Sequence, residues 1–443
     1  MKIQFDGAIK NSLNTDSKAK YLISIIKKNC FEEFYNFLNE HDDMSVIVIG
    51  EGTNVVLPEY FDGAVVKISS SGLLPEFNKI NLNIPTNIDK NTKICDFISV
   101  GALVNWDDLV KAMIEHNIYG FENLSGIPGS VGAAPLQNIG AYGQEISNLI
   151  HSVDCYDYSQ NKFVNLSNKD CNFSYRNSSI KNKPYIIYNV NFYQSKQSYL
   201  NPKLDLDYES IKLYLDDHDI NPQSINLSDV RNIILSIRSQ KLPNYIYERT
   251  VGSFFKNPIV KVENIDTTRF SLNHLILWKI DEITSKAGAA RLIELIKNDL
   301  DDYENVYLSN KHSLVLCTNG RATQNEILEF ASHIQEKIFY NINGLRNASL
   351  VLQRGYTYDF GYPNAHPLRF STTSDGTHNS GSAFTTGVST STYVTSITVD
   401  SNTPNTLYYY CQHHSGMGGQ ITVIDTNRDT TINIDNVNNP SHS

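Results

Sequence analysis

The amino-acid sequence predicts a mixed α/β (α+β) fold followed by a small all-β module, and three observations lead to this fold class. Over the first 355 residues, amphipathic helical patterns alternate with short apolar strands. Two glycine-rich turns interrupt this part of the chain, at residues 50–54 and 126–145. Residues 356–443 then contain no Lys and no Glu and are rich in Ser, Thr, Asn, Gly and Tyr, which indicates a separate unit.

Composition excludes several classes of protein. The chain has 443 residues, a formal net charge of −10 and a pI of about 5.6, so we expect no broad electrostatic capture of nucleic acid. No apolar run approaches the ~18–20 residues of a membrane span, and the N-terminus lacks the apolar segment of a secretory signal. The six cysteines are scattered without a C-x-x-C pair. We therefore expect a reduced, cytoplasmic protein; the oligomeric state is left open.

The predicted elements follow from local periodicity. Helical spacing predicts a helix over 18–40, and the apolar run "SVIVIG" predicts a buried strand over 45–50. An amphipathic helix is expected over 105–120, a hairpin over 153–167, and a further helix over 325–344. In the last part, "STYVTSITV" and "TLYYYC" have strand character, and turn residues flank them.

The stretch "GIPGSVGAAPLQNIGAYGQE" holds five glycines in twenty residues. Glycine at this density costs chain entropy, so we expect a ligand to lie close to the backbone here. An earlier turn, "VIVIGEGTNVVLP", runs from a strand directly into Gly50. Backbone N–H groups in such turns can face an anion, but the residues match neither a P-loop nor G-x-G-x-x-G, and a simple tight turn remains an alternative.

Together, five blocks in order resemble the UDP-N-acetylenolpyruvoylglucosamine reductase family, type I, over about residues 13–350. They are "GEGTNVVLPEYFDGAVV", "GFENLSGIPGSVGAAPLQNIGAYGQE", "CNFSYRNSSIK", "IRSQKLP" and "GSFFKNP". The resemblance implies an FAD-binding two-domain core of the vanillyl-alcohol-oxidase/PCMH type plus a third, substrate-binding domain. The expected domains are 1–80 and 81–244 for FAD, 245–355 for substrate, and 356–443 for the β module.

The resemblance implies an enzyme that uses NADPH and FAD to reduce UDP-N-acetylglucosamine enolpyruvate to UDP-N-acetylmuramate for peptidoglycan. The FAD diphosphate is expected on backbone amides of both glycine turns, because side chains would obstruct so many N–H donors. Three residues are expected near the flavin ring. The implied cofactor residues are Gly50, Gly52, Thr53, Asn54, Gly126, Pro128, Gly129, Ser130 and Gly132, with Gln137, Asn138 and Ala141 at the ring.

The catalytic residues are also carried over by resemblance. Ser253 stands where the family keeps its proton donor, and Arg176 where it binds the substrate carboxylate through a planar guanidinium. The substrate-binding residues implied are Tyr175, Tyr208, Lys241 and Asn257, with Lys256 as a further nearby donor.

The chain departs from the family pattern at the end of the reductase part. The family has a strand L-E-P-E-V whose second Glu assists catalysis, whereas this chain reads "LRNASLVL", with Ala348 or Ser349 at that place. The third-domain pattern is also only partly kept. A second hypothesis is therefore a flavin-binding protein that lacks this reductase activity.

The β module contains a possible copper site. "LYYYCQHHSGMGG" carries Cys411, His414 and Met417, and His366 lies upstream in "NAHPLRF". One thiolate, two imidazoles and a thioether are the ligands of blue copper, and the spacing resembles small cupredoxins. The alternative is a glycine-rich turn beside a buried cysteine. A third hypothesis follows, a copper protein with a vestigial flavin scaffold.

Overall fold

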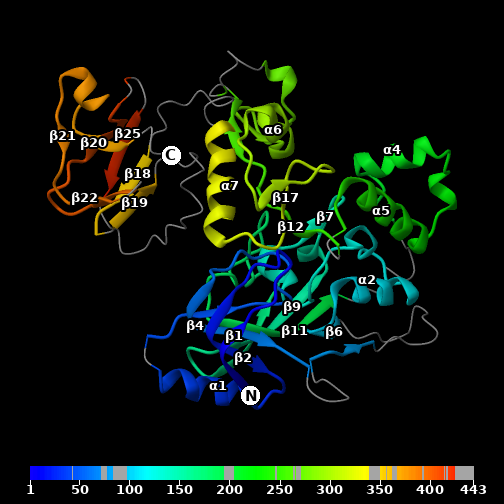
Figure 1. The fold of residues 1–443 in the computed structure, drawn as a ribbon. Coiled ribbons are helices and arrows are strands. Elements are labelled where there is room, and N and C mark those ends of the chain that lie inside the picture. The colour runs from blue at the N-terminus through cyan, green and yellow to red at the C-terminus, as the bar shows by residue number, and fades with distance from the viewer. Residues whose placement is uncertain are drawn as a thin grey trace. The chain divides into compact units, whose positions relative to one another are not determined.

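The computed structural model describes the chain except for residues 42, 71–76, 83–96, 194–203, 245–246, 263–264, 266–270, 339–349, 356, 362–366, 392–393, 414, 416–417 and 425–443. The chain forms two compact units (Figure 1). The first comprises Met1–Phe254 and Asp302–Phe330, and the second comprises Phe255–Asp301 and Ala331–Ser443. Across the described residues, no helix combines the length and apolar character needed to cross a membrane.

The first unit begins with a four-stranded sheet in the order β1-β2-β4-β3. Its strands are β1 (Lys2–Ala8), β2 (Lys18–Ile25), β3 (Val46–Val48) and β4 (Tyr60–Ile68), with β2 and β3 each parallel to β4. The strand expected over 45–50 is confirmed. The helix expected over 18–40 is wrong in its first part, because 18–25 is β2 and only α1 (Cys30–Asn39) is helical. Ile23 and Ile25 pair with β4 and are buried, an outcome that helical spacing alone does not reveal.

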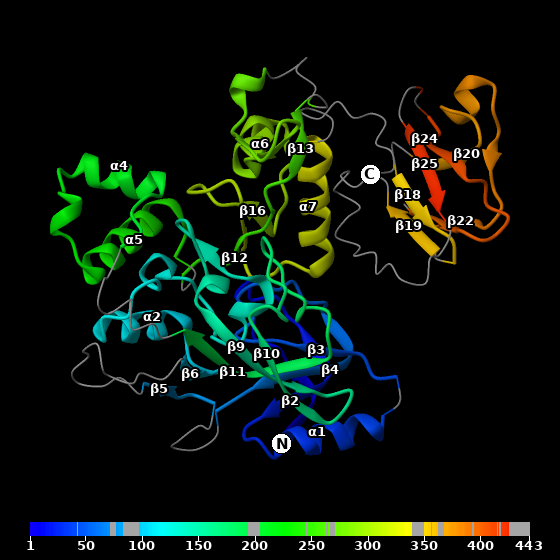
Figure 2. The ribbon, with the colours of Figure 1, turned by 180° about the vertical axis from the view of Figure 1, so that it is seen from behind.

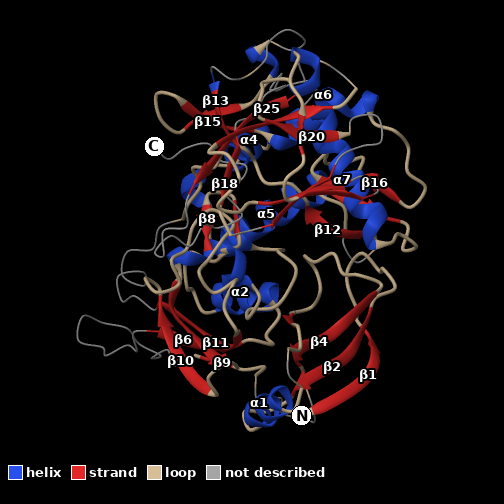
Figure 3. Cartoon of the chain, turned by 90° about the vertical axis from the view of Figure 1, so that its left-hand side faces the viewer, coloured by secondary structure: helices blue, strands red, loops and turns tan. Residues whose placement is uncertain are grey.

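A second sheet has the order β10-β9-β11-β6-β5, and all its pairs are antiparallel. The strands are β5 (Ile80–Asn81), β6 (Phe97–Gly101), β9 (Ile150–Asp157), β10 (Lys162–Ser167) and β11 (Tyr185–Tyr193). The β9–β10 pair confirms the expected hairpin. Figure 3 shows the two sheets side by side with α1 at their common end. The rings of Phe31 in α1 and Tyr156 in β9 lie 4.7 Å apart and join both sheets in one core.

Three helices complete the part of the first unit that carries the site. Helix α2 (Trp106–Glu115) confirms the helix expected over 105–120, although it ends before Gly120, and it buries Leu109 and Met113 against the second sheet. Helices α4 (Glu209–Asp217) and α5 (Leu227–Lys241) share their own apolar core. Asn226 begins α5 with a capping box to Asp229.

A small sheet, β12-β17-β16, follows in the same unit. It consists of β12 (Arg249–Ser253), β16 (Val306–Leu308) and β17 (Val315–Thr318). Helix α7 (Gln324–Ile338) confirms most of the helix expected over 325–344, whose remainder lies outside the described residues.

The second unit contains the sheet β13-β15-β14 and the C-terminal module. The first sheet has β13 (Ile259–Lys261), β14 (Leu277–Lys279) and β15 (Thr284–Ala287), and α6 (Ala289–Ile296) follows it. The module has two sheets, which Figure 2 shows from behind. One is β18-β25-β24-β20-β21, and the other is β19-β23-β22. Their bounds are β18 (Leu350–Gln353), β19 (Thr357–Gly361), β20 (Leu368–Ser371), β21 (Ala383–Phe384), β22 (Val388–Ser391), β23 (Val394–Thr398), β24 (Thr406–Cys411) and β25 (Gly418–Ile424).

The core of the module joins these two sheets. Phe370, Leu407 and Ile421 from one sheet pack with Ile397 from the other. Strands β23 and β24 confirm the strand character expected there. Strand β18 pairs in parallel with β25, so the module's sheet begins upstream of the composition change at Gly355.

Candidate functional site

The two glycine turns face each other inside the first unit. A Cβ placed on Gly129 would lie 3.1 Å from Thr53 Oγ1, and one on Gly50 would lie 3.0 Å from Ser130 Oγ. Side chains also join the turns, since Asn54 Nδ2 donates to Gln137 Oε1 at 2.9 Å. The two turns, 83 residues apart at this bond, therefore lie against each other.

The backbone amides of the second turn are not equivalent. Gly126 N–H donates to Asp107 Oδ1 at 2.6 Å, and Gly132 N–H donates to Ala102 O at 2.9 Å. These two amides are engaged inside the protein, which differs from the expectation that they face a phosphate. The N–H groups of Gly129 and Ser130 have no acceptor in the part of the chain that the structure describes. Those two amides are the donors that this turn can offer to an anion.

The first turn is held against the chain that precedes it. Gly52 O accepts a hydrogen bond from Ser12 N at 3.0 Å. A Cβ on Gly52 would lie 2.6 Å from Lys10 O, closer than real Cβ atoms approach, so this position needs glycine. Among the described residues, the N–H groups of Thr53 and Asn54 meet no acceptor.

Asn138 holds the hairpin that follows the second turn. This hairpin pairs β7 (Gly140–Ala141) with β8 (Gln144–Glu145). Asn138 is 1% exposed, and its Nδ2 donates to Glu145 Oε2 at 2.7 Å and to Ser174 O at 3.1 Å. Both amide hydrogens are thus used inside the protein, so the Asn138 side chain anchors the hairpin. Ala141, by contrast, is only half-buried in β7.

Arg176 lies beside the same hairpin. Its Nη2 donates to Gly140 O at 2.8 Å, and its guanidinium carbon lies 5.4 Å from the centre of the Tyr175 ring. Tyr142, between the two strands of the hairpin, contacts Tyr208 edge-on, with ring centres 5.5 Å apart; Tyr208 is the residue directly before α4. The structure therefore brings Tyr208 and the neighbouring residues Tyr175 and Arg176 to one hairpin, although the three segments are distant in sequence.

Ser253 ends β12 at an irregular pairing. Thr250 pairs with Cys317 and Ser253 with Val315, so the register shifts between them. A bulge of this kind redirects a side chain at the end of a strand, and Ser253 is exposed. Lys241, the last residue of α5, is exposed as well.

Asn257 belongs to the second unit, as does Lys256. The Oδ1 atom of Asn257 accepts a hydrogen bond from Ala289 N at 3.0 Å, at the start of α6. The side-chain oxygen of Asn257 thus caps the first turn of α6. Glu282, a third-domain carboxylate that could replace the absent family Glu, is exposed and pairs with Lys279 at 3.0 Å.

Several predicted residues lie outside the described part of the chain. They are Ala348, Ser349, His366, His414 and Met417, together with Glu263, a second substitute considered for the absent Glu. Of the four copper ligands predicted, only Cys411 is described; it is buried at the end of β24. Within the described residues, no three His, Cys, Asp or Glu side chains gather in a group that could hold a metal ion.

Electrostatics single out Asp107, which sequence reasoning missed. Burial alone would raise the pKa of its carboxyl, but Arg231, the Gly126 N–H and Arg238 outweigh burial, so the pKa lies below its ordinary value. Arg231 donates to both carboxylate oxygens at 2.7 Å. The sequence signal that could have pointed to Asp107 is the pair of acidic residues at the start of the helix in "NWDDLV", which precedes a glycine-rich turn.

The buried cysteines offer no nucleophile. Burial raises the pKa of Cys171 to about 12 and that of Cys317 to about 11, and it also raises the pKa of Cys155. A thiol acts as a nucleophile through its thiolate. These three thiols therefore stay protonated near neutral pH.

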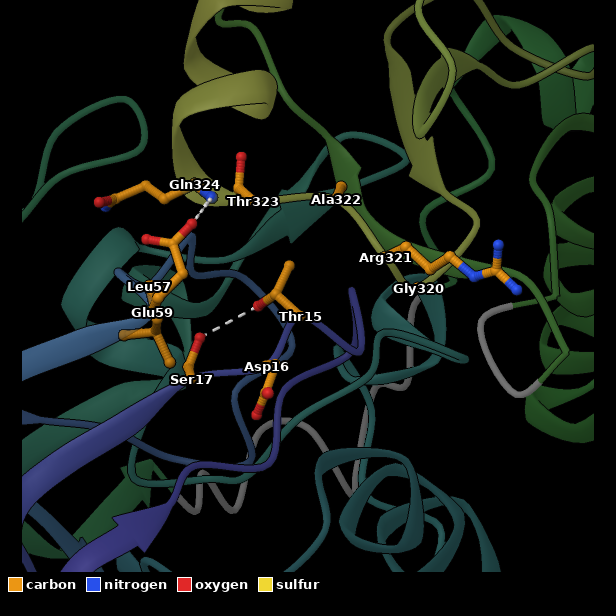
Figure 4. Close-up of a pocket in the computed structure, with 10 residues that line it drawn as sticks. All are labelled: Thr15, Asp16, Ser17, Leu57, Glu59, Gly320, Arg321, Ala322, Thr323 and Gln324. Carbon is orange, nitrogen blue, oxygen red and sulfur yellow. Dashed lines mark hydrogen bonds between the residues drawn. The ribbon is translucent and has the colours of Figure 1, made fainter.

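A small hollow lies elsewhere in the first unit (Figure 4). None of its lining residues belongs to the predicted site. They are Thr15, Asp16, Ser17, Leu57, Glu59, Gly320, Arg321, Ala322, Thr323 and Gln324.

Comparisons with known proteins cover most of the chain. A family model described as FAD binding domain matches residues 31–167, and one described as UDP-N-acetylenolpyruvoylglucosamine reductase, C-terminal domain, matches residues 243–344. Neither model extends into residues 345–443.

Individual relatives match over nearly their whole length. The UDP-N-acetylenolpyruvoylglucosamine reductase of Flavobacterium johnsoniae is 30% identical over 344 residues, 76% of this chain and 96% of that protein. That of Xanthomonas euvesicatoria is 31% identical over 331 residues, 74% of this chain and 89% of that protein. The crystal structure of the Thermus caldophilus reductase aligns with 74% of this chain and 91% of its own, with 18% identity and a TM-score of 0.48.

Proposed function

The chain belongs to the UDP-N-acetylenolpyruvoylglucosamine reductase family, and we propose that it reduces UDP-N-acetylglucosamine enolpyruvate to UDP-N-acetylmuramate for peptidoglycan synthesis, with FAD as cofactor and NADPH as co-substrate. The match to 96% of a relative supports the proposal. The observation that carries it is the meeting of the two glycine turns, joined by a hydrogen bond between residues 83 apart, around backbone amides that have no acceptor among the described residues.

The residues present fit the diphosphate of FAD. Gly129 and Ser130 on one turn, with Thr53 and Asn54 on the other, offer backbone N–H groups that have no acceptor among the described residues. The side chains nearest to Gly50 and Gly129 across the two turns are small, namely those of Thr53, Ser130 and Ala133. FAD, when bound, supplies the hydride chemistry between NADPH and the enolpyruvyl group. Gln137 and Ala141 stay the proposed contacts of its ring.

Arg176 binds and polarises the substrate carboxylate. A guanidinium presents two parallel N–H donors, which suit a carboxylate. In the structure one Nη group donates to Gly140 O, which orients the plane of the guanidinium beside the hairpin. Withdrawal of electrons by this ion pair makes the adjacent double bond more electrophilic. Tyr175, Tyr208, Lys241 and Asn257 are the further proposed substrate contacts, and Lys256 is a nearby donor.

Ser253 donates the proton that completes the reduction. It is exposed at the bulged end of β12, so its hydroxyl is accessible. A serine hydroxyl is a weak acid, and it protonates only a strongly basic carbon, such as the one next to the carboxylate held by Arg176.

The missing family Glu leaves two hypotheses of function. With Ala348 or Ser349 at that place, we propose a reductase that turns over slowly; the alternative is a flavin protein without this activity. Anaerobic mixing separates them. The reductase requires that NADPH bleaches the bound flavin and that the enolpyruvyl substrate restores its colour, whereas a chain whose reduced flavin never reacts with substrate would have lost the reaction.

For the C-terminal module we propose a cupredoxin-like copper site as a second function. The two segments that carry its ligands run side by side, since Leu368 pairs with Cys411 and Gln412 N donates to Pro367 O at 2.8 Å. A copper–thiolate absorption band and one bound copper per chain, both lost in Cys411→Ser, are expected. If no such band appeared after loading with Cu(II), the segment would be a glycine-rich turn beside a buried cysteine and the copper site would be refuted.

We also propose a reducing, cytoplasmic location. The described cysteines Cys30, Cys155, Cys171, Cys317 and Cys411 are all free thiols, which suits such a compartment.

A further inference from the structure

Asp107 in the first turn of α2 contacts the glycine turn on which the proposed FAD site depends. Its Oδ1 accepts the N–H of Gly126 at 2.6 Å, and Arg231 of α5 donates to both carboxylate oxygens at 2.7 Å. The Asp107 side chain is 33% exposed and that of Arg231 16%. The carboxylate is thus shared between the turn and the helix.

Gly126 is also held through its carbonyl, in the next peptide unit. Arg238 Nη2 donates to Gly126 O at 2.9 Å. Gly126 has φ +72°, and a Cβ there would lie 2.8 Å from Leu235 Cδ2 and 3.1 Å from Arg238 Nε. Both hydrogen bonds of Gly126 involve an ionised partner, and such bonds are roughly twice as strong as neutral ones. Gly126 is therefore clamped between α2 and α5.

Two bonds from Trp106, the residue before Asp107, continue this attachment. Its indole Nε1 donates to Leu124 O at 3.0 Å, and its backbone N–H donates to Gly129 O at 2.9 Å. In a trans peptide the C=O and the following N–H point in opposite directions. With Gly129 O directed toward α2, the N–H of Ser130 is directed away from α2.

We propose that Asp107 is a positioning residue for FAD: by holding Gly126 it fixes the turn so that the N–H groups of Gly129 and Ser130 face the diphosphate. This inference rests on the proposed FAD site. Arg231 and Arg238 beside one carboxylate leave the cluster with a net positive charge, so Asp107 does not repel the diphosphate. The sequence led us to expect Gly126 at the phosphate; in this proposal its N–H group instead joins the turn to Asp107.

The test compares Asp107→Ala, Asp107→Asn and, as matched control, Asp108→Ala, which removes an exposed carboxylate from the same first turn. FAD is titrated into the apoprotein of the full chain. Asp107→Ala should raise the Kd for FAD about tenfold or more, the effect of one lost charge-assisted hydrogen bond. Asp107→Asn keeps an acceptor for Gly126 N–H and should recover part of that loss. The control should bind FAD like the wild type.

A second measurement separates positioning from stability. At saturating FAD, the phosphorus-31 NMR signals of the bound diphosphate should shift in Asp107→Asn but not in Asp108→Ala. If the Ala and Asn variants lost FAD affinity equally and the phosphorus signals did not shift, Asp107 would act only through its ion pair with Arg231. That result would overturn the inference. So would wild-type affinity in Asp107→Ala. A wild-type chain that bound no FAD would instead refute the proposed function.

Discussion

The carboxylate of Glu59 accepts a hydrogen bond from the backbone N–H of Gln324 at 3.1 Å, at the first residue of α7 (Figure 4). The adjacent Thr323 and Glu326 bond reciprocally, each N–H to the other's side chain, so this helix start has a local capping box as well. Glu59 directly precedes β4, and it is 265 residues from Gln324 in sequence. A residue directly before a strand of the first sheet thus caps a helix near the end of the reductase part.

Replacement of Glu59 tests this cap. Glu59→Ala should lower the free energy of unfolding by ~0.5–1 kcal/mol, because one helix N–H loses its acceptor and the helix dipole loses a favourable charge. Urea unfolding measures the change. Asp62→Asn is the control; Asp62 is exposed and pairs with Lys20 at the surface, where such pairs contribute little. Equal effects in both variants would contradict a specific cap.

Gly129→Asp should cost the protein its flavin. Gly129 has φ +114°, and a side chain there would meet Thr53 Oγ1 and add a negative charge beside the diphosphate. Flavin absorbance after gel filtration measures retention. Gly355→Asp controls for backbone strain and charge, since Gly355 has φ +88° with nothing within 4 Å of its added Cβ. Full flavin in Gly129→Asp would show that the diphosphate lies elsewhere.

Ser253→Ala should affect only the second half of the reaction. Flavin reduction by NADPH needs no proton from Ser253, whereas reoxidation by the enolpyruvyl substrate should slow by ~10²–10⁴-fold. Stopped-flow absorbance of the flavin separates the two steps. Equal slowing of both would indicate a folding defect or another role for the residue.

Restoring a carboxylate near the end of the reductase part should speed the second half-reaction. Loss of one preorganised group typically costs ~10²–10³ in rate, so Ala348→Glu or Ser349→Glu should recover part of this factor, and only one of them. Each variant serves as the control for the other. Normal reoxidation by the wild type would mean that another residue, with Glu263 or Glu282 the first to mutate, replaces the Glu.

Asp107 should contribute to acid stability in a defined direction. Its pKa is below its ordinary value in the folded protein, so its contribution is fully present above the unfolded pKa and is lost as pH falls through the folded pKa. The stability gap between wild type and Asp107→Asn should therefore be constant near neutral pH and shrink below about pH 4. Urea unfolding at both ends of this range measures it. A gap that stayed constant into acid would contradict the lowered pKa.

Some features of this protein could be predicted from local patterns. Local sequence predicts the glycine-rich turns, the strand within 45–50 and the β9–β10 hairpin. Each of them depends on the propensities and turn-forming residues of a few neighbouring positions. Five blocks in order, those around Arg176 and Ser253 among them, together carry the family resemblance. Cys411 was correctly placed at the end of a strand.

The sequence by itself thus determined the family, the order of most elements and the two turns that border the site. Only the tertiary structure decided that 18–25 is a strand, because its partner β4 lies more than thirty residues away, and that β18 joins the C-terminal module through β25. It also decided which amides can meet a phosphate. Gly126 and Gly132 look like Gly129 in the sequence, but their N–H groups have acceptors on Asp107 and Ala102. Each such pairing depends on which distant backbone or side-chain group lies within hydrogen-bond distance, and local sequence carries no record of that proximity.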